Sequence, residues 1–282
     1  RRQRQMCIRD SVWNDKGNAL STKMREQFIN RDFTDWRDLM LKDGTQQNHF
    51  IQVAGAGQKV SYRLGAGYQQ EDGVMGDGMK RFNVKMAIDG KINKYIKVGA
   101  TANLVDSQNS EDKTKGYRVL GTMYAQYQPV NDVIIKTTFS PTFSTRRRGE
   151  YYGGLSSAQS STYNASTNPT GTSSATVTRN ESFSYTWDTQ VNYVKTVKED
   201  HSFNAMALLS VYSTEAEKYA LTGEGVTPKT LWYNMGSAKS YSDIESSYGK
   251  ATMLSYALRL NYAYKGRYLA TISSRWDGYS KF

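Results

Sequence analysis

Few residues in this 282-residue chain have the type and spacing that enzymatic or metal chemistry requires. The only thiol and the two imidazoles belong to Cys7, His49 and His201, which are too few to build a zinc site. The glycine-rich stretch from Gly73 to Gly78 joins two strand-like segments and opens no helix, which argues against a phosphate-binding loop. We therefore expect no enzyme, no metal and no cofactor.

Aromatic side chains in two long polar segments are the better candidates for a binding site. Such rings can stack on the sugar rings of a substrate, and they can equally pack one loop against another. Both interpretations stay open for the five candidates, which are Tyr151, Tyr152, Tyr163, Trp232 and Tyr233.

The formal net charge of +11 raises the question of a nucleic-acid partner. Basic residues cluster only at the N-terminus and at Arg146–Arg148, and elsewhere they alternate with acidic and apolar residues. We therefore expect no nucleic-acid partner. Basic residues at the outer strand ends could instead meet outer-membrane lipid and lipopolysaccharide, and Arg146–Arg148 is either the solvated base of a loop or an anion site.

Strands must position these candidates, because Gln46 to Phe282 consists of ten amphipathic strand-like segments. The predicted tight connections are Gly55–Lys59, Gly90–Lys94, Gln128–Asp132, Val197–His201 and Lys265–Arg267. The predicted longer connections alternate with them, and are Gln70–Met79, Asp106–Lys115, Gly149–Asn180 and Ser213–Lys250. An antiparallel meander with tight turns at one end and long loops at the other is typical of an outer-membrane β-barrel.

Alternation inside each segment supports a membrane barrel. In Leu254–Tyr264 the even positions are apolar or aromatic and the odd positions are small or polar, so the strand has two different faces. Stripes of five or six apolar residues predict strands of about 9–11 residues, the length that crosses a bilayer. Charges in mid-strand, such as Lys85 and Arg259, suit a watery lumen better than the packed core of a soluble β-sandwich, which is the alternative.

We expect the apolar set to face lipid on the convex side, namely Tyr62, Leu64, Phe82, Val84, Ile96, Val98, Tyr256, Leu258 and Leu260. The polar set should face the concave lumen, namely Arg63, Lys85, Lys97, Asp188, Arg259 and Asn261. A mean hydropathy of −0.68 agrees with this arrangement, because half of every spanning strand is polar.

The ends of the sequence do not read as natural ends. Residues 1–10 resemble translated adapter sequence and are excluded from fold reasoning. Residues 11–45 read as a loop with short helical turns at Ser21–Ile29 and Phe33–Met40, in which Trp36 packs. Residues 46–282 read as a partial barrel.

The order of several motifs resembles SusC/RagA-type TonB-dependent outer-membrane transporters of Bacteroidota. The matching stretches are Thr34–Trp36, Gln47–Ala56, Tyr62–Tyr68 with Asp72 and Gly73, Lys80–Val84, Tyr185–Asp188 and Tyr268–Phe282. Departures are modest, such as Ala54 and Ala56 where the family prefers Ser and Gly. The two longest loops show no match and should hold whatever determines the substrate.

The resemblance implies that about ten strands of a larger, plugged barrel of 22 strands are present. It also implies active import of oligosaccharides or peptides, powered through TonB and working with a SusD-like surface lipoprotein. The alternatives are a passive porin, a surface adhesin barrel, or a soluble β-rich binding domain.

Overall fold

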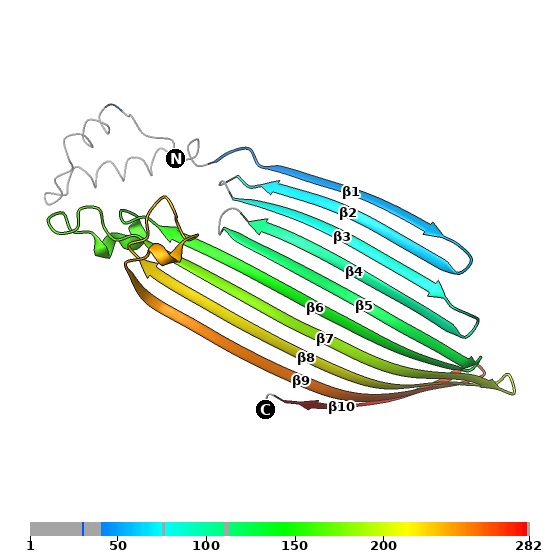
Figure 1. The fold of residues 1–282 in the computed structure, drawn as a ribbon. Coiled ribbons are helices and arrows are strands. Elements are labelled where there is room, and N and C mark those ends of the chain that lie inside the picture. Colours follow the sequence, from blue (N-terminus) through cyan, green and yellow to red (C-terminus); the bar gives the residue numbers. More distant parts are fainter. Residues whose placement is uncertain (1–29, 31–40, 75–76, 110–112, 281–282) are drawn as a thin grey trace. The chain divides into compact units, whose positions relative to one another are not determined.

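The computed structural model describes residues 30, 41–74, 77–109 and 113–280. One antiparallel sheet dominates this part, with ten strands paired in chain order (Figure 1). The strands are β1 Thr45–Ala56, β2 Val60–Asp72, β3 Gly78–Lys91, β4 Ile96–Asn109, β5 Thr114–Val130, β6 Val133–Tyr152, β7 Ser174–Val197, β8 His201–Glu224, β9 Ser240–Tyr264 and β10 Tyr268–Tyr279. Two short 3-10 helices, η1 (Ser157–Thr162) and η2 (Met235–Ser237), lie in the two longest connections. The predicted ten-stranded antiparallel meander is therefore confirmed.

The tight turns fall where the sequence predicts them. Between β9 and β10, Lys265 and Gly266 have φ angles of 51° and 63°, and the Arg267 amide donates to the Tyr264 carbonyl at 3.0 Å. Positive φ at both central residues is the mark of a type I′ turn, whose twist matches that of the flanking strands. Lys198 and Glu199 have positive φ angles in the same way between β7 and β8.

The predicted strand length of about 9–11 residues is wrong, because the strands run from 12 residues in β1 and β10 to 25 in β9. The predicted loops Gly149–Asn180 and Ser213–Lys250 shrink to residues 153–173 and 225–239, since β6–β9 extend into them. Outside a bilayer both faces of a strand meet water, so the alternation that marks a strand in the sequence disappears. The backbone ladder continues there, and ion pairs such as Lys218–Glu245 at 2.7 Å cross it.

The bounds predicted for the other two long connections are also wrong, because the strands on either side extend into them. Gln70–Met79 and Asp106–Lys115 reduce to residues 73–77 and 110–113, about as short as the turns at the opposite end. The asymmetry between the two ends of the sheet therefore rests on the connections β6–β7 and β8–β9 alone.

Cross-strand register divides the sheet into two faces, because residues directly opposite each other point to the same side. Tyr62 opposes Ile88, which opposes Ala100, and the row continues across the sheet in this way. All nine residues predicted to face lipid fall on one face, and all six residues predicted to face the lumen fall on the other.

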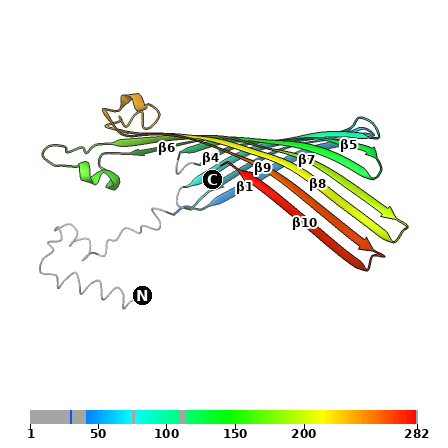
Figure 2. The ribbon, with the colours of Figure 1, turned by 90° about the horizontal axis from the view of Figure 1, so that it is seen from below.

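The apolar face is the convex one. In Figure 2 the central strands form the crest of an arch, β1 and β10 lie lower, and the segment 225–239 lies on the convex side. Trp232 in this segment covers Gly149, and Gly149 shares the apolar face with Phe143 on β6. We call the convex, apolar side the outer face and the concave, polar side the inner face. The predicted orientation is confirmed.

Few of the described residues are buried, because the sheet has no second layer packed against it. The buried cluster is Ala175, Val226 and Trp232, while Leu258 in mid-strand is 53% exposed. A soluble sandwich would bury one face of each sheet, so that alternative is wrong for the part of the chain that the structure describes.

Among the described residues, no helix is long and apolar enough to cross a membrane. The predictions for residues 1–10, for helical turns at Ser21–Ile29 and Phe33–Met40, and for Trp36 fall outside the described residues.

Candidate functional site

Trp232, one of the five candidate aromatic residues, lies on the outer face and is only 4% exposed. It occupies the space over Gly149, where an added Cβ would come within 2.0 Å of the indole Cδ2. The guanidinium of Arg147 lies 5.1 Å from the centre of the indole ring, within cation–π range. Trp232 therefore anchors the segment 225–239 to β6, and it is not an open platform for a sugar.

Of the other four candidate aromatic residues, two lie beside Trp232 and two lie elsewhere. Tyr233 stacks on Trp232 with ring centres 4.0 Å apart and is 68% exposed, and Tyr151 packs against the buried cluster. Tyr152 is adjacent to Tyr151 on a strand and so points to the inner face. Tyr163 follows η1 and is about half exposed. The structure thus brings Tyr151, Trp232 and Tyr233 together but leaves Tyr152 and Tyr163 apart from them.

The connection 153–173 holds itself together through its own polar side chains. The Asn168 side-chain amide donates to the Thr162 carbonyl at 2.8 Å, and the Thr172 amide donates to the Thr162 hydroxyl at 2.8 Å. Gly154 and Gly171 lie so close that no Cβ fits at either position. The Ser, Thr and Asn content of this segment therefore supports a folded loop that presents Tyr163.

The inner face carries the groups that would meet a solute in a lumen. Ladders of hydroxyl groups cross it, such as Ser144 to Ser182 at 2.8 Å and Thr122 to Ser140 at 3.3 Å. Three guanidinium groups, Arg81, Arg118 and Arg146, point to the same side near the end that carries the longer connections. Within the described residues no carboxylate pairs with any of the three.

Sequence reasoning found Arg146 as part of a run of three arginines, but it missed Arg81 and Arg118 as its neighbours. Gly116 opposes Arg146 and Ser107 opposes Gly116, so only the register brings the three strands into line. The alternation in each strand shows which face a cation occupies, and that signal was available in the sequence.

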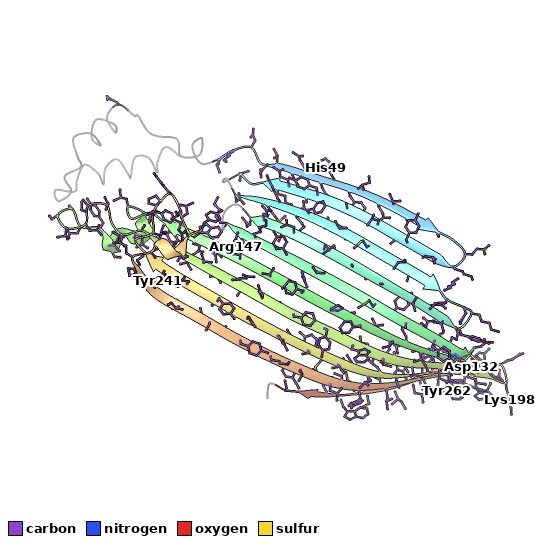
Figure 3. The ribbon with its side chains drawn as sticks, viewed as in Figure 1. His49, Asp132, Arg147, Lys198, Tyr241 and Tyr262 are labelled. Carbon is purple, nitrogen blue, oxygen red and sulfur yellow. The ribbon has the colours of Figure 1, made fainter. Side chains whose placement is uncertain are left out.

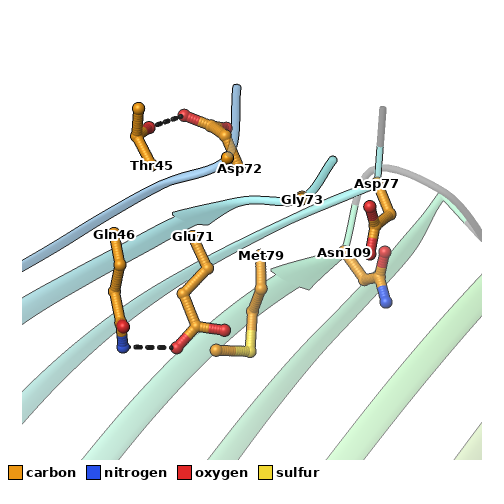
Figure 4. Close-up of a pocket in the computed structure, with 10 residues that line it drawn as sticks. Thr45, Gln46, Glu71, Asp72, Gly73, Asp77, Met79 and Asn109 are labelled. Carbon is orange, nitrogen blue, oxygen red and sulfur yellow. Dashed lines mark hydrogen bonds between the residues drawn. The ribbon is translucent and has the colours of Figure 1, made fainter. Parts of the chain in front are cut away.

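A pocket of about 310 Å³ lies at the same end of β1–β4 and is acidic in character (Figure 4). Two of its three carboxylates are already hydrogen bonded, because Glu71 accepts from the Gln46 amide at 3.0 Å and Asp72 accepts from the Thr45 hydroxyl at 3.2 Å. Among the described residues, no three or more His, Cys, Asp or Glu side chains are placed so that they could hold a metal ion together. We assign no ligand to this pocket.

No family model matches the chain. In sequence the chain is similar to TonB-dependent receptor P26 of Formosa agariphila, with 24% identity over 306 residues, covering 88% of this chain and 29% of that relative. In fold it is similar to the RagAB peptide transporter, with a TM-score of 0.78 and 14% identity over 98% of this chain and 39% of that one. The ferric citrate transporter FecA has a TM-score of 0.62 and 8% identity, covering 84% of this chain and 35% of its own.

The chain spans less than two fifths of the length of each of these relatives. All three are named as receptors or transporters, and none is named as an enzyme. An apolar convex face, a polar concave face and strict chain-order pairing are the properties of an outer-membrane barrel wall. The predicted fold class and outer-membrane location are confirmed. The chain has the fold of part of a TonB-dependent transporter β-barrel, and its predicted resemblance to SusC/RagA-type transporters is confirmed in sequence by TonB-dependent receptor P26 and in fold by RagAB.

Proposed function

We propose that the protein imports peptides or oligosaccharides across the outer membrane, with energy supplied through TonB and with a SusD-like surface lipoprotein as its partner. One observation carries the proposal, namely a single-layer sheet of ten strands whose outer face is apolar across its middle and whose inner face is mostly polar. Such a wall separates lipid from an aqueous or plugged lumen. Lipid covers the apolar outer face, against which no second protein layer packs in the described residues.

The inner-face arginines favour substrates that carry negative charge. Arg118 and Arg146 lie on neighbouring strands in diagonal register, and Arg81 lies on β3 close to the same end. Arginine binds carboxylates through two parallel hydrogen bonds, so an acidic peptide or an acidic oligosaccharide fits this surface better than a neutral one. RagAB is described as a peptide importer, which favours the peptide.

Tyr152 and Tyr163 remain candidates for substrate contact in this proposal. Both are exposed by two fifths or more, and Tyr152 points to the inner face. Tyr151, Trp232 and Tyr233 gather on the outer face, which argues against their contact with a solute in the lumen.

Whole-cell uptake tests the proposal. A strain that lacks the gene for this protein is complemented with the wild-type gene, and the uptake of labelled acidic, neutral and basic peptides and of oligosaccharides is measured with and without functional TonB. We expect uptake that needs both the protein and TonB, with co-purification of a lipoprotein. Uptake that persists without TonB would favour a passive porin, and binding to surfaces without uptake would favour an adhesin.

Replacing the inner-face arginines gives a sharper test of the substrate class. Arg81→Gln, Arg118→Gln and Arg146→Gln together should reduce the uptake of acidic peptides by roughly tenfold or more and leave neutral peptides nearly unchanged. An equal loss for all peptides would contradict the assignment of these arginines to substrate charge.

A further inference from the structure

A row of cations crosses the outer face just beyond its aromatic border. Lys80 opposes Gln108, Gln108 opposes Lys115, and Lys115 opposes Arg147. Arg147 in turn opposes Arg179, which forms an ion pair with Glu181. Four strands therefore contribute cations to one line that no single stretch of sequence reveals.

The first three cations surround a pocket, which we call the rim pocket. It has a volume of about 310 Å³, and Lys113 adds a fourth cation to its lining. Trp232 and Tyr233 form one wall, and the contact of Arg147 with the Trp232 ring fixes the guanidinium there. Figure 3 shows Arg147 at the end of the sheet that carries the longer connections.

The charge of the rim pocket is not balanced within the described residues. Asp72 is the one carboxylate in its lining, and this group already accepts hydrogen bonds from Thr45 and from the Gln70 amide at 2.8 Å. Asp106 lies one row away from Lys115 on the same face, so the four cations of the lining outnumber the two nearby carboxylates. Lys115 and Arg147 are directly opposite each other, and like charges in this position destabilise a sheet. A bound anion would offset that repulsion.

The position of the rim pocket along the strands, relative to the apolar part of the outer face, indicates the kind of anion. On the same face, the next row toward the turns contains the three aromatic residues Tyr68, Phe82 and Tyr117, with Asp106 between the last two. The row after it contains Val84, Leu104 and Val119. Aromatic rings mark the headgroup layer of a membrane, and aliphatic side chains mark the hydrocarbon. An anion in the rim pocket therefore sits at headgroup level, directly above acyl chains.

We propose that the rim pocket binds the phosphorylated sugar headgroup of an outer-leaflet glycolipid, whose acyl chains lie along the aliphatic row below. Phosphate accepts charge-assisted hydrogen bonds from ammonium and guanidinium groups, and a sugar ring matches the exposed Tyr233 ring. The site lies on the opposite face of the sheet from the surface assigned to substrate, so it stands independently of the import proposal.

Native mass spectrometry of the detergent-purified full protein tests the site. The variant carries Lys80→Gln, Lys115→Gln and Arg147→Gln, and the control carries Arg81→Gln, Arg118→Gln and Arg146→Gln, which removes equal charge near the same end but on the inner face. We expect the rim variant to lose bound phosphorylated glycolipid by about tenfold or more and the control to retain it. Equal retention in both proteins, or equal loss from both, would overturn the proposal.

Reconstitution of the unmodified protein separates the lipid from other sources of phosphate. Nanodiscs are prepared with phosphorylated or with dephosphorylated lipid A, and inorganic phosphate is added as a competitor. The proposal requires binding that depends on the lipid phosphates and that millimolar inorganic phosphate does not displace. Binding of both lipids alike, or displacement by free phosphate, would contradict it. This measurement needs no variant and so remains decisive if the triple replacement fails to fold.

Discussion

Gly149 shows at the scale of single residues how the outer rim is assembled. The absence of a side chain lets the Trp232 indole lie flat on β6, and Arg147 two positions earlier covers the same ring. Through this contact the connection 225–239 is held over Ala175, which is fully buried.

We predict that Gly149→Val will displace Trp232, because the new Cβ would meet the indole at 2.0 Å. Overpacking of this kind costs about 1–3 kcal/mol, and the segment 225–239 should open. Limited trypsin digestion at Lys229 and Lys239 measures the opening. Gly249→Val is the matched control, since that strand glycine has open space around it. Equal protection of both variants would show that Trp232 does not anchor the segment.

Adjacent positions on β9 should respond in opposite ways to a change of polarity. Leu258 lies on the outer face, and Arg259 lies on the inner face opposite Met206 and Ser273. Leu258→Arg should cost about 2–4 kcal/mol if the position is near the middle of the bilayer, whereas Arg259→Leu should cost much less. Urea unfolding of the full protein in lipid vesicles gives both values. A tolerated Leu258→Arg beside a severe Arg259→Leu would reverse the assignment of the faces.

At the scale of elements, the hairpins are fixed by their short turns. The β9–β10 turn places Lys265 in a left-handed conformation that favours Asn or Gly, while the following Gly266 already suits its φ angle.

We therefore expect Lys265→Asn to stabilise the hairpin by a few tenths of a kcal/mol to about 1 kcal/mol, and Gly266→Val to destabilise it by about 1–2 kcal/mol. The midpoint of urea unfolding in vesicles reports both changes. Gly57→Val in the β1–β2 turn serves as the control, because Gly57 has no positive φ and its nearest neighbour would lie 3.6 Å from the new Cβ. A loss of stability at Gly57 as large as that at Gly266 would contradict the backbone explanation.

At the scale of the whole molecule, the sheet has two edges, since β1 pairs only with β2 and β10 pairs only with β9 among the described residues. Both edge strands are exposed along nearly their whole length. Unpaired backbone groups cost several kcal/mol each in hydrocarbon, and in water they promote aggregation.

We predict that the 282-residue polypeptide, refolded alone in detergent, will not yield a monodisperse monomer. Gel mobility before and after heating, together with circular dichroism, measures this outcome. A heat-modifiable monomer with full β content would show that the ten strands close on themselves. That closure would need a new strand tilt and register, because strand number and shear are coupled in a barrel.

The sequence by itself determined which side chains share a face within each strand. In Leu254–Tyr264 the alternation of Leu, Tyr and polar residues is a local property, because successive side chains on a strand point to opposite sides whatever the strand pairs with. The same local pattern located the tight turn at Lys265–Arg267. The order of the motifs indicated the resemblance to TonB-dependent transporters.

Only the tertiary structure decided where strands end and which side chains become neighbours between them. Polar stretches such as Ser213–Glu224 carry no apolar stripe, so their pairing with β7 and β9 shows only in the backbone ladder. Lys115 meets Arg147, and Trp232 meets Gly149, through cross-strand register and loop packing that join residues far apart in the chain. Register is set cooperatively by all the strands and turns together, and for that reason no local pattern of residues could reveal the rim pocket.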